Sequence, residues 1–173
     1  HYSFIEPRYF ASRLLHHIPH DAHPPHNVAY AEQLVADVYN AVRSGPAWQR
    51  TLLLIVFDEH GGCYDHVPPP AAIPTGLPAP NGFTFDRYGP RVPAVVVSPY
   101  VAPGSVIRPR KDGPPFDHTS IIATLDALFD LGAPLSRRAA RAPDLLDALC
   151  LERPENDGPD CIDAAASEPT RAE

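Results

Sequence analysis

Residues 51–63, TLLLIVFDEHGGC, decide the fold, because a continuous apolar run stops abruptly at two acidic residues and a glycine pair. Thr51 to Phe57 is rich in β-branched and aromatic side chains. Its length suits a strand buried on both faces, as in a parallel sheet. Ligands of open α/β sheets bind beyond the carboxyl ends of the strands. The run therefore predicts both a buried strand and a site at its end.

Working outward, a second buried strand is predicted at 93–98, PAVVVS. Apolar residues recur at helical spacing over 28–44, between Asn27 as N-cap and the stop signal Gly45-Pro46. A further helix is expected to begin at Asp117 or His118, with its apolar face inward, and to end at Gly132; a short one is expected at about 143–150. Helices and buried strands together favour an α/β domain with helices on both faces of the sheet. Two strands cannot form that sheet alone, so we expect its other strands to lie outside this sequence.

The chain has 173 residues, the size of one domain. It begins with His1 rather than Met, so we expect its beginning to be missing. We assign residues 1–150 to the C-terminal portion of a single domain and expect residues 151–173 to be a polar, disordered tail.

The composition excludes several classes of protein. The formal net charge is −7 with neutral histidines, which argues against a nucleic-acid binder that presents a basic face. No run reaches the roughly 18 apolar residues of a membrane-spanning helix, so stable membrane insertion is not expected. An acidic chain that binds an anionic substrate needs a local cation, and a bound metal ion is the usual one.

The three cysteines cannot all pair within the chain. Cys150 and Cys161 are near enough in sequence to pair in an oxidising compartment, or to remain free. Cys63 is expected to be a small buried hydrophobic residue.

The acidic pair Asp58-Glu59 has two interpretations. Gly61 and Gly62 free the backbone to turn, so that both carboxylates can converge on one cation. Oxygen ligands suit a hard divalent ion such as Ca²⁺, Mg²⁺ or Mn²⁺. Alternatively, Asp58 caps the turn and Glu59 faces solvent. The density of polar residues that follows, with Asp65 next, favours a functional site.

Four histidines, His17, His20, His23 and His26, recur every third residue. The intervening prolines disfavour a helix, so the spacing does not align them as a zinc site. One or two of them near a phosphate is the better interpretation. His118, at a predicted helix start, is either a helix cap or a phosphate contact.

The strand and its acidic end, extended to residues 51–70 as TLLLIVFDEHGGCYDHVPPP, resemble the signature of the phosphoesterase family of bacterial phospholipases C, acid phosphatases and plant non-specific phospholipases C. Four further segments resemble that family in the same order: SFIEPRYF (3–10), HDAHPPHNV (20–28), GPRVPAVVVSPYVAPGSV (89–106) and FDHTSIIATL (116–125). The resemblance covers residues 1 to about 150.

The resemblance implies an alkaline-phosphatase-like three-layer α/β/α sandwich, present here in part, and metal-dependent hydrolysis of phosphate monoesters or phospholipid diesters. It implies Asp58 and Glu59 as metal ligands, and His23 and His60 as catalytic residues. The residues that it implies for substrate binding are Asp65, His66 and His118. It also implies a secreted, periplasmic or cell-surface protein.

The family's Glu-Asn metal ligands and its Ser or Thr nucleophile have no counterpart in this sequence. We therefore expect the chain alone to be inactive. A relative of sulfatases or phosphoglycerate mutases is a second interpretation, which the DEHGG-x₂-DH-x-PPP string disfavours. A degenerate, non-catalytic binding module is a third. The sequence does not define the substrate head group, the metal or the oligomeric state.

Overall fold

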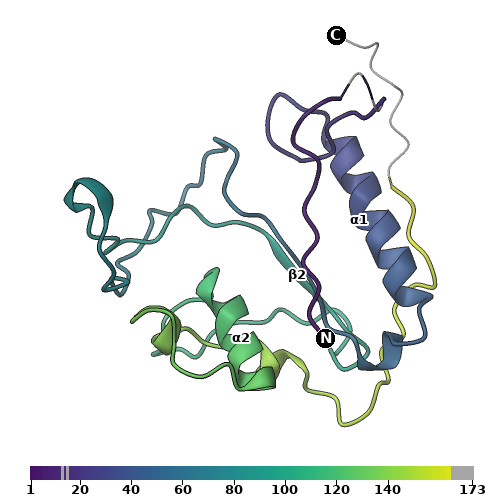
Figure 1. Cartoon of the computed structure of the whole chain (residues 1–173). Helices are drawn as coiled ribbons and strands as arrows, with labels where there is room; N and C mark the ends of the chain where they lie inside the picture. Colours follow the sequence, from purple (N-terminus) through teal and green to yellow (C-terminus); the bar gives the residue numbers. More distant parts are fainter. Residues whose placement is uncertain (13, 15, 165–173) are drawn as a thin grey trace.

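The computed structural model describes residues 1–12, 14 and 16–164 of the chain. They form a mixed α/β structure with two α-helices and a two-stranded sheet (Figure 1). The four short 3₁₀ turns are η1 (Trp48–Arg50), η2 (Pro80–Gly82), η3 (Ala139–Arg141) and η4 (Leu146–Ala148).

Helix α1 spans Val28–Arg43, as its sequence predicts. The Oδ1 atom of Asn27 accepts a hydrogen bond from the N–H of Ala29 at 3.0 Å, which satisfies one of the free donors of the first turn. The helix buries Ala36 and Tyr39 on one face. Both ends are encoded locally, and this is why the prediction is confirmed to within one residue.

The sheet consists of β1 (Leu53–Val56) and β2 (Ala94–Val97), which confirms both predicted strands but not their environment. The strands pair antiparallel, with Leu53 opposite Val97, so the parallel arrangement was wrong. Val56 and Val95 are exposed. An apolar run indicates that a strand can be buried. Whether the strand pairs parallel or antiparallel depends on its partner strand, about 40 residues away in the sequence. Among the described residues, neither helix packs extensively on this sheet, so the predicted helices on both faces are not seen.

Helix α2 spans Thr119–Phe129 and begins, as expected, beside Asp117, whose Oδ1 accepts from the N–H of Thr119 at 2.7 Å. Its buried residues are Ser120 and Thr124, whereas Phe129 is exposed. The prediction of an inward apolar face holds only in part, because Ile121, Ile122 and Leu125 are half-buried whereas Leu128 and Phe129 are exposed. The Thr124 hydroxyl accepts from the buried N–H of Leu145 at 2.9 Å, and this bond draws the polar face inward.

Both predicted ends in this region also differ. Helix α2 ends in a left-handed residue, Asp130 (φ 51°), rather than at Gly132. The helix expected at about 143–150 is reduced to the single turn η4. The segment between Pro143 and Cys150 is only about two turns long, and nucleating so short a helix is costly.

Within segment 151–164, for which disorder was expected, residues 159–162 are bonded to α1, along which this part of the chain runs (Figure 1). The side-chain amide of Asn40 donates to the carbonyl of Ile162 at 2.9 Å and accepts from its N–H at 2.9 Å. The Tyr39 hydroxyl donates to the Pro159 carbonyl at 2.5 Å. Composition alone could not reveal these partners on α1. The rest of the expected tail, residues 165–173, lies outside the described residues.

The connection between β1 and β2 projects away from α1 (Figure 1). It is held by Arg138, whose guanidinium donates to the carbonyls of Ile73 and Phe85 and lies 5.2 Å from the ring of Tyr88. The proline-rich connection between the strands is thus an ordered loop, which Arg138 holds in place.

Candidate functional site

The acidic pair lies in the turn that follows β1, at the predicted place. Asp58 Oδ1 accepts the N–H of Glu59 at 2.9 Å, and Glu59 Oε2 accepts the N–H of Gly61 at 2.7 Å. Both residues are exposed. Each carboxylate therefore uses one oxygen to hold the turn. Asp58 does cap the turn, as one interpretation held, but this leaves its second oxygen available.

The glycine pair makes this turn possible. Gly61 and Gly62 have φ values of 59° and 76°, where side chains are strained. A Cβ on Gly61 would lie 3.1 Å from Cδ of Pro24, whereas one on Gly62 would meet nothing within 4 Å. Gly61 is therefore the point where the acidic turn packs against the histidine loop, residues 20–26.

We expect Gly61→Ala to destabilise the chain more than Gly62→Ala. In both variants the alanine must adopt a positive φ, which costs about 1–3 kcal/mol. The difference between their losses of unfolding free energy therefore reflects the contact with Pro24. Denaturant unfolding of the two variants measures it. Equal losses of unfolding free energy would contradict the packing assigned to Gly61.

His23 faces the acidic turn across this contact. Its Nε2 lies 3.4 Å from Glu59 Oε1, and the two side chains are 62% and 46% exposed. Its Nδ1 lies 2.7 Å from the carbonyl oxygen of Pro24. A carbonyl can only accept, so Nδ1 carries a proton and Nε2 is the nitrogen presented to the site.

Asp21 is the buried acid of the histidine loop, with 5% of its surface exposed. Its Oδ1 lies 2.7 Å from His26 Nδ1, and its Oδ2 accepts the N–H of His23 at 3.1 Å. Burial raises the pKa of Asp21, but the hydrogen bonds from His26 and from the backbone outweigh it and hold the pKa below its usual range.

We expect this depressed pKa to make the chain sensitive to acid. A carboxyl whose pKa is lower in the folded state stabilises the fold fully above its ordinary pKa of about 4, and this contribution is lost as the pH falls through the folded value. Unfolding free energies measured from pH 5 down to 2 should fall less steeply in Asp21→Asn than in the wild type. An unchanged slope would contradict the assignment.

His60 and His118 lie at the same end of β1 but point to backbone carbonyls. His60 Nδ1 lies 2.8 Å from the carbonyl oxygen of Cys63, and His118 Nε2 lies 3.0 Å from that of Phe57. His118 precedes α2 without a side-chain cap bond. Cys63 is exposed together with its neighbours Gly62 and Tyr64, so its predicted burial was wrong. Cys150 and Cys161 are exposed free thiols.

Asp65 is engaged by Arg91 rather than directed to an open site. It accepts from Arg91 Nε at 3.0 Å, from Nη2 at 2.8 Å and from the Arg91 backbone N–H at 2.9 Å. The Arg91 side chain holds the pKa of Asp65 well below its usual range. This pair ties the loop after the acidic turn to the segment before β2. The neighbouring His66 is exposed.

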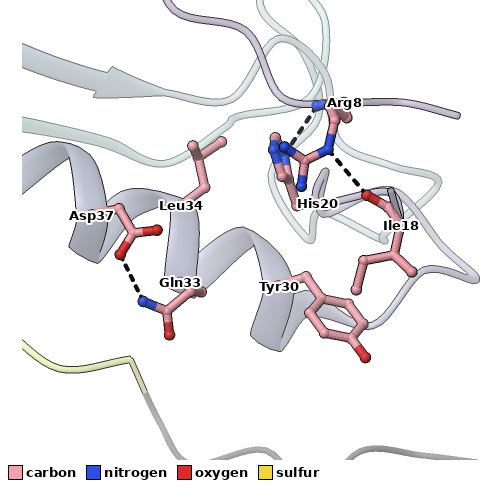
Figure 2. A pocket seen from close by; sticks show the side chains of 7 residues that line it. All are labelled: Arg8, Ile18, His20, Tyr30, Gln33, Leu34 and Asp37. Atoms are coloured by element: carbon pink, nitrogen blue, oxygen red, sulfur yellow. Dashed lines mark hydrogen bonds between the residues drawn. The ribbon is translucent and has the colours of Figure 1, made fainter. Parts of the chain in front are cut away.

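The other histidines are spread over separate contacts. His20 Nδ1 accepts the N–H of Arg8 at 3.0 Å, beside a pocket of about 200 Å³ between the N-terminal segment and α1 (Figure 2). That pocket is lined by Arg8, Ile18, His20, Tyr30, Gln33, Leu34 and Asp37. His17 pairs with Ser12 through backbone hydrogen bonds. Within residues 1–12, 14 and 16–164, no three His, Cys, Asp or Glu side chains lie together as a metal cluster.

Tyr9 is a neighbour of the site that the sequence did not single out. Burial and the negative charges of Glu6, Asp58 and Asp21 raise the pKa of its phenol. The structure thus brings together Asp58, Glu59 and His23, with Tyr9 and Asp21 around them. His60 and His118 lie at the same strand end, while Asp65 is tied to Arg91.

Comparison with known proteins identifies the family. The model of the Phosphoesterase family matches residues 1–132. The chain belongs to the phosphoesterase family. It is 45% identical over 166 residues to non-specific phospholipase C6 of Arabidopsis thaliana, covering 90% of this chain and 31% of that relative.

Other family members give a consistent picture. Non-specific phospholipase C3 of Arabidopsis thaliana is 41% identical, over 91% of this chain and 31% of that protein. The non-hemolytic phospholipase C of Burkholderia pseudomallei strain K96243 is 31% identical, over 85% of this chain and 23% of that protein. The chain thus spans less than a third of the length of these relatives, which fits the predicted portion of a longer domain.

Proposed function

We propose that this chain is part of a metal-dependent hydrolase of phosphate esters of the phospholipase C type. The observation that supports it most strongly is the Asp58-Glu59 turn at the end of β1, with the Nε2 atom of His23 at 3.4 Å from Glu59. Relatives named phospholipase C from a plant and a bacterium support the same activity. They disfavour the alternative of a non-catalytic binding module.

Asp58 and Glu59 are the residues that would hold a divalent metal ion. Their exposed carboxylate oxygens match the preference of Ca²⁺, Mg²⁺ and Mn²⁺. When bound, such an ion lowers the pKa of a coordinated hydroxyl and neutralises charge on phosphoryl oxygens. Two carboxylates supply only part of the roughly six to eight oxygen ligands of such an ion, so we propose that other ligands and a Ser or Thr nucleophile lie outside this chain.

His23 is the proposed proton donor to the leaving alkoxide. Its Nδ1 is fixed by the carbonyl of Pro24, so a proton can be held or released at Nε2, on the side of Glu59. His60 is also proposed to take part in catalysis, and its Nδ1 bond to Cys63 likewise fixes the ring.

The remaining site residues are proposed to bind and frame the substrate. His66 and His118 are proposed to contact the phosphate, and Asp65 to shape the site by fixing Arg91 and the intervening loop. The substrate is proposed to be a phosphate ester, with phospholipids as one class. In the part of the chain that the structure describes, neither helix has the length and apolar character of a membrane span.

The two strands are proposed to belong to a larger sheet. Val56 and Val95 are exposed on β1 and β2, as expected of strands whose covering layers come from elsewhere. The arrangement proposed for the whole domain is the three-layer sandwich.

Hydrolysis assays test the proposal that the nucleophile and the remaining metal ligands lie outside this chain. The 173 residues alone are expected to hydrolyse neither p-nitrophenyl phosphate nor p-nitrophenyl phosphocholine, with or without Mn²⁺ or Ca²⁺. A protein that contains this chain together with the nucleophile segment should hydrolyse one of them and lose activity in a chelator. Metal-dependent turnover by the 173 residues would show that the nucleophile is in this chain.

A further inference from the structure

Asp21 holds both ends of the turn that carries His23. Its Oδ2 accepts the N–H of His23 at 3.1 Å, and its Oδ1 lies 2.7 Å from Nδ1 of His26. The turn is closed by a backbone hydrogen bond from the N–H of His26 to the carbonyl of His23 at 2.9 Å. Only 5% of the surface of Asp21 is exposed, so water competes little for these bonds.

A carboxylate matches both partners of this contact without any change of tautomer. A backbone N–H can only donate, and an imidazole nitrogen beside an ionised carboxylate donates as well. A carboxylate offers an acceptor oxygen to each donor. A side-chain amide offers one oxygen and one NH₂ group, so it keeps both contacts only if His26 moves its proton to Nε2 and accepts at Nδ1.

The turn in turn fixes the direction of His23. The His23 ring is bound through Nδ1 to the carbonyl of Pro24, and the Pro24 ring lies against Gly61. With the turn closed, Nε2 faces Glu59 Oε1 at 3.4 Å. If the turn opens, the backbone of His23 loses the bond to Asp21 that fixes its place in the loop.

We propose that Asp21 is a positioning residue, which grips His26 and the backbone of His23 and thereby holds the His23 imidazole opposite Glu59. The catalytic use of this arrangement rests on the proposed function. The position of the His23 ring opposite Glu59 can be measured without any catalysis. Asp21 touches neither member of the acidic pair, so it acts through His23.

Nuclear magnetic resonance of the ¹⁵N,¹³C-labelled 173-residue chain tests this directly. In the wild type, the His23 ring should give a nuclear Overhauser cross-peak to the Glu59 side chain, and His26 should carry its proton on Nδ1. Asp21→Ala, which removes both acceptor oxygens, should abolish the cross-peak and shift the His23 amide to the position of an unbonded N–H. Asp21→Asn should instead move the His26 proton to Nε2, because its NH₂ group can only donate.

Two further variants keep the test decisive. Asp37→Asn changes an exposed acid on α1 that accepts from Gln33, and it should leave the cross-peak and the tautomer intact. His26→Ala removes one of the two bonds and should weaken the cross-peak, so it replaces Asp21→Ala if that variant does not fold. An unchanged cross-peak in a folded Asp21→Ala, or in His26→Ala in its place, would overturn the proposal.

Titration of the same samples with Mn²⁺ separates the two claims. If Asp21 is a positioning residue, Asp21→Ala loses the His23 contact but binds Mn²⁺ within about twofold of the wild type. Loss of the contact in a chain that binds no Mn²⁺ would support the role of Asp21 and count against the proposed function. Retained contact with Mn²⁺ binding would overturn the role of Asp21 alone.

Discussion

Asp58→Asn is expected to lower phosphate-ester hydrolysis by at least about 100-fold in an active protein that contains this chain. A metal ion stabilises transition-state charge by several kcal/mol, and about 3 kcal/mol corresponds to roughly 100-fold in rate. The substitution retains the size of the side chain and an oxygen that can accept the N–H of Glu59. The turn should therefore persist while the negative charge is lost.

Steady-state hydrolysis of p-nitrophenyl phosphocholine or p-nitrophenyl phosphate over a range of Mn²⁺ concentrations measures the effect. A ligand role predicts that excess Mn²⁺ partly restores the rate. Asp37→Asn is the matched control, because it removes the same charge from the exposed face of α1. Full activity of Asp58→Asn at low Mn²⁺ would remove Asp58 from the metal site.

Trp48→Ala is expected to have the largest effect on stability, with a loss of about 3–5 kcal/mol of unfolding free energy. Trp48 is 4% exposed, its ring packs edge-on against Tyr39 at 6.5 Å, and the guanidinium of Arg43 lies 5.2 Å from it. Tyr39 also holds segment 151–164 through the carbonyl of Pro159. Losing the indole should therefore loosen that segment as well.

Trp48→Phe is the informative control. Within the described residues, the Nε1 atom of Trp48 is buried without a hydrogen-bond partner, and such a donor itself costs free energy. Phenylalanine removes the donor and keeps most of the ring, so its cost should be less than half that of Trp48→Ala. Denaturant unfolding and hydrogen exchange at the Ile162 amide measure both effects. Similar losses for the two variants would contradict the packing role of the ring.

The sequence predicted the features that depend on neighbouring residues. The ends of α1 follow from Asn27 and from the Gly45-Pro46 stop, and both are local. The acidic turn after β1 follows from an apolar run that ends in Asp58 and the glycine pair. These elements needed no information from distant parts of the chain.

Features that depend on distant partners were not predicted. The antiparallel pairing of β1 with β2, the polar inward face of α2 and the exposure of Cys63 all depend on what packs against them. The attachment of segment 151–164 depends on Asn40, more than 110 residues earlier. Composition carries no signal for such contacts.

The role of Asp21 was missed although a local signal existed. An Asp side chain commonly accepts the backbone N–H two residues later, and here that residue is His23. The order Asp-x-His-Pro-Pro-His therefore predicts a turn that begins at Asp21. The histidine spacing alone gives no sign that Asp21 bonds to two of these histidines.

The central claim is that Asp58 and Glu59 form half of a metal site, and calorimetric titration of the 173-residue chain with Mn²⁺ or Ca²⁺ tests it most directly. The account predicts one weak site, with a dissociation constant on the order of 0.1–1 mM as in the weaker Ca²⁺ sites of proteins. Binding should be lost in Asp58→Asn and in Glu59→Gln and kept in Asp37→Asn. Equal binding by all four proteins, or none by the wild type, would contradict it.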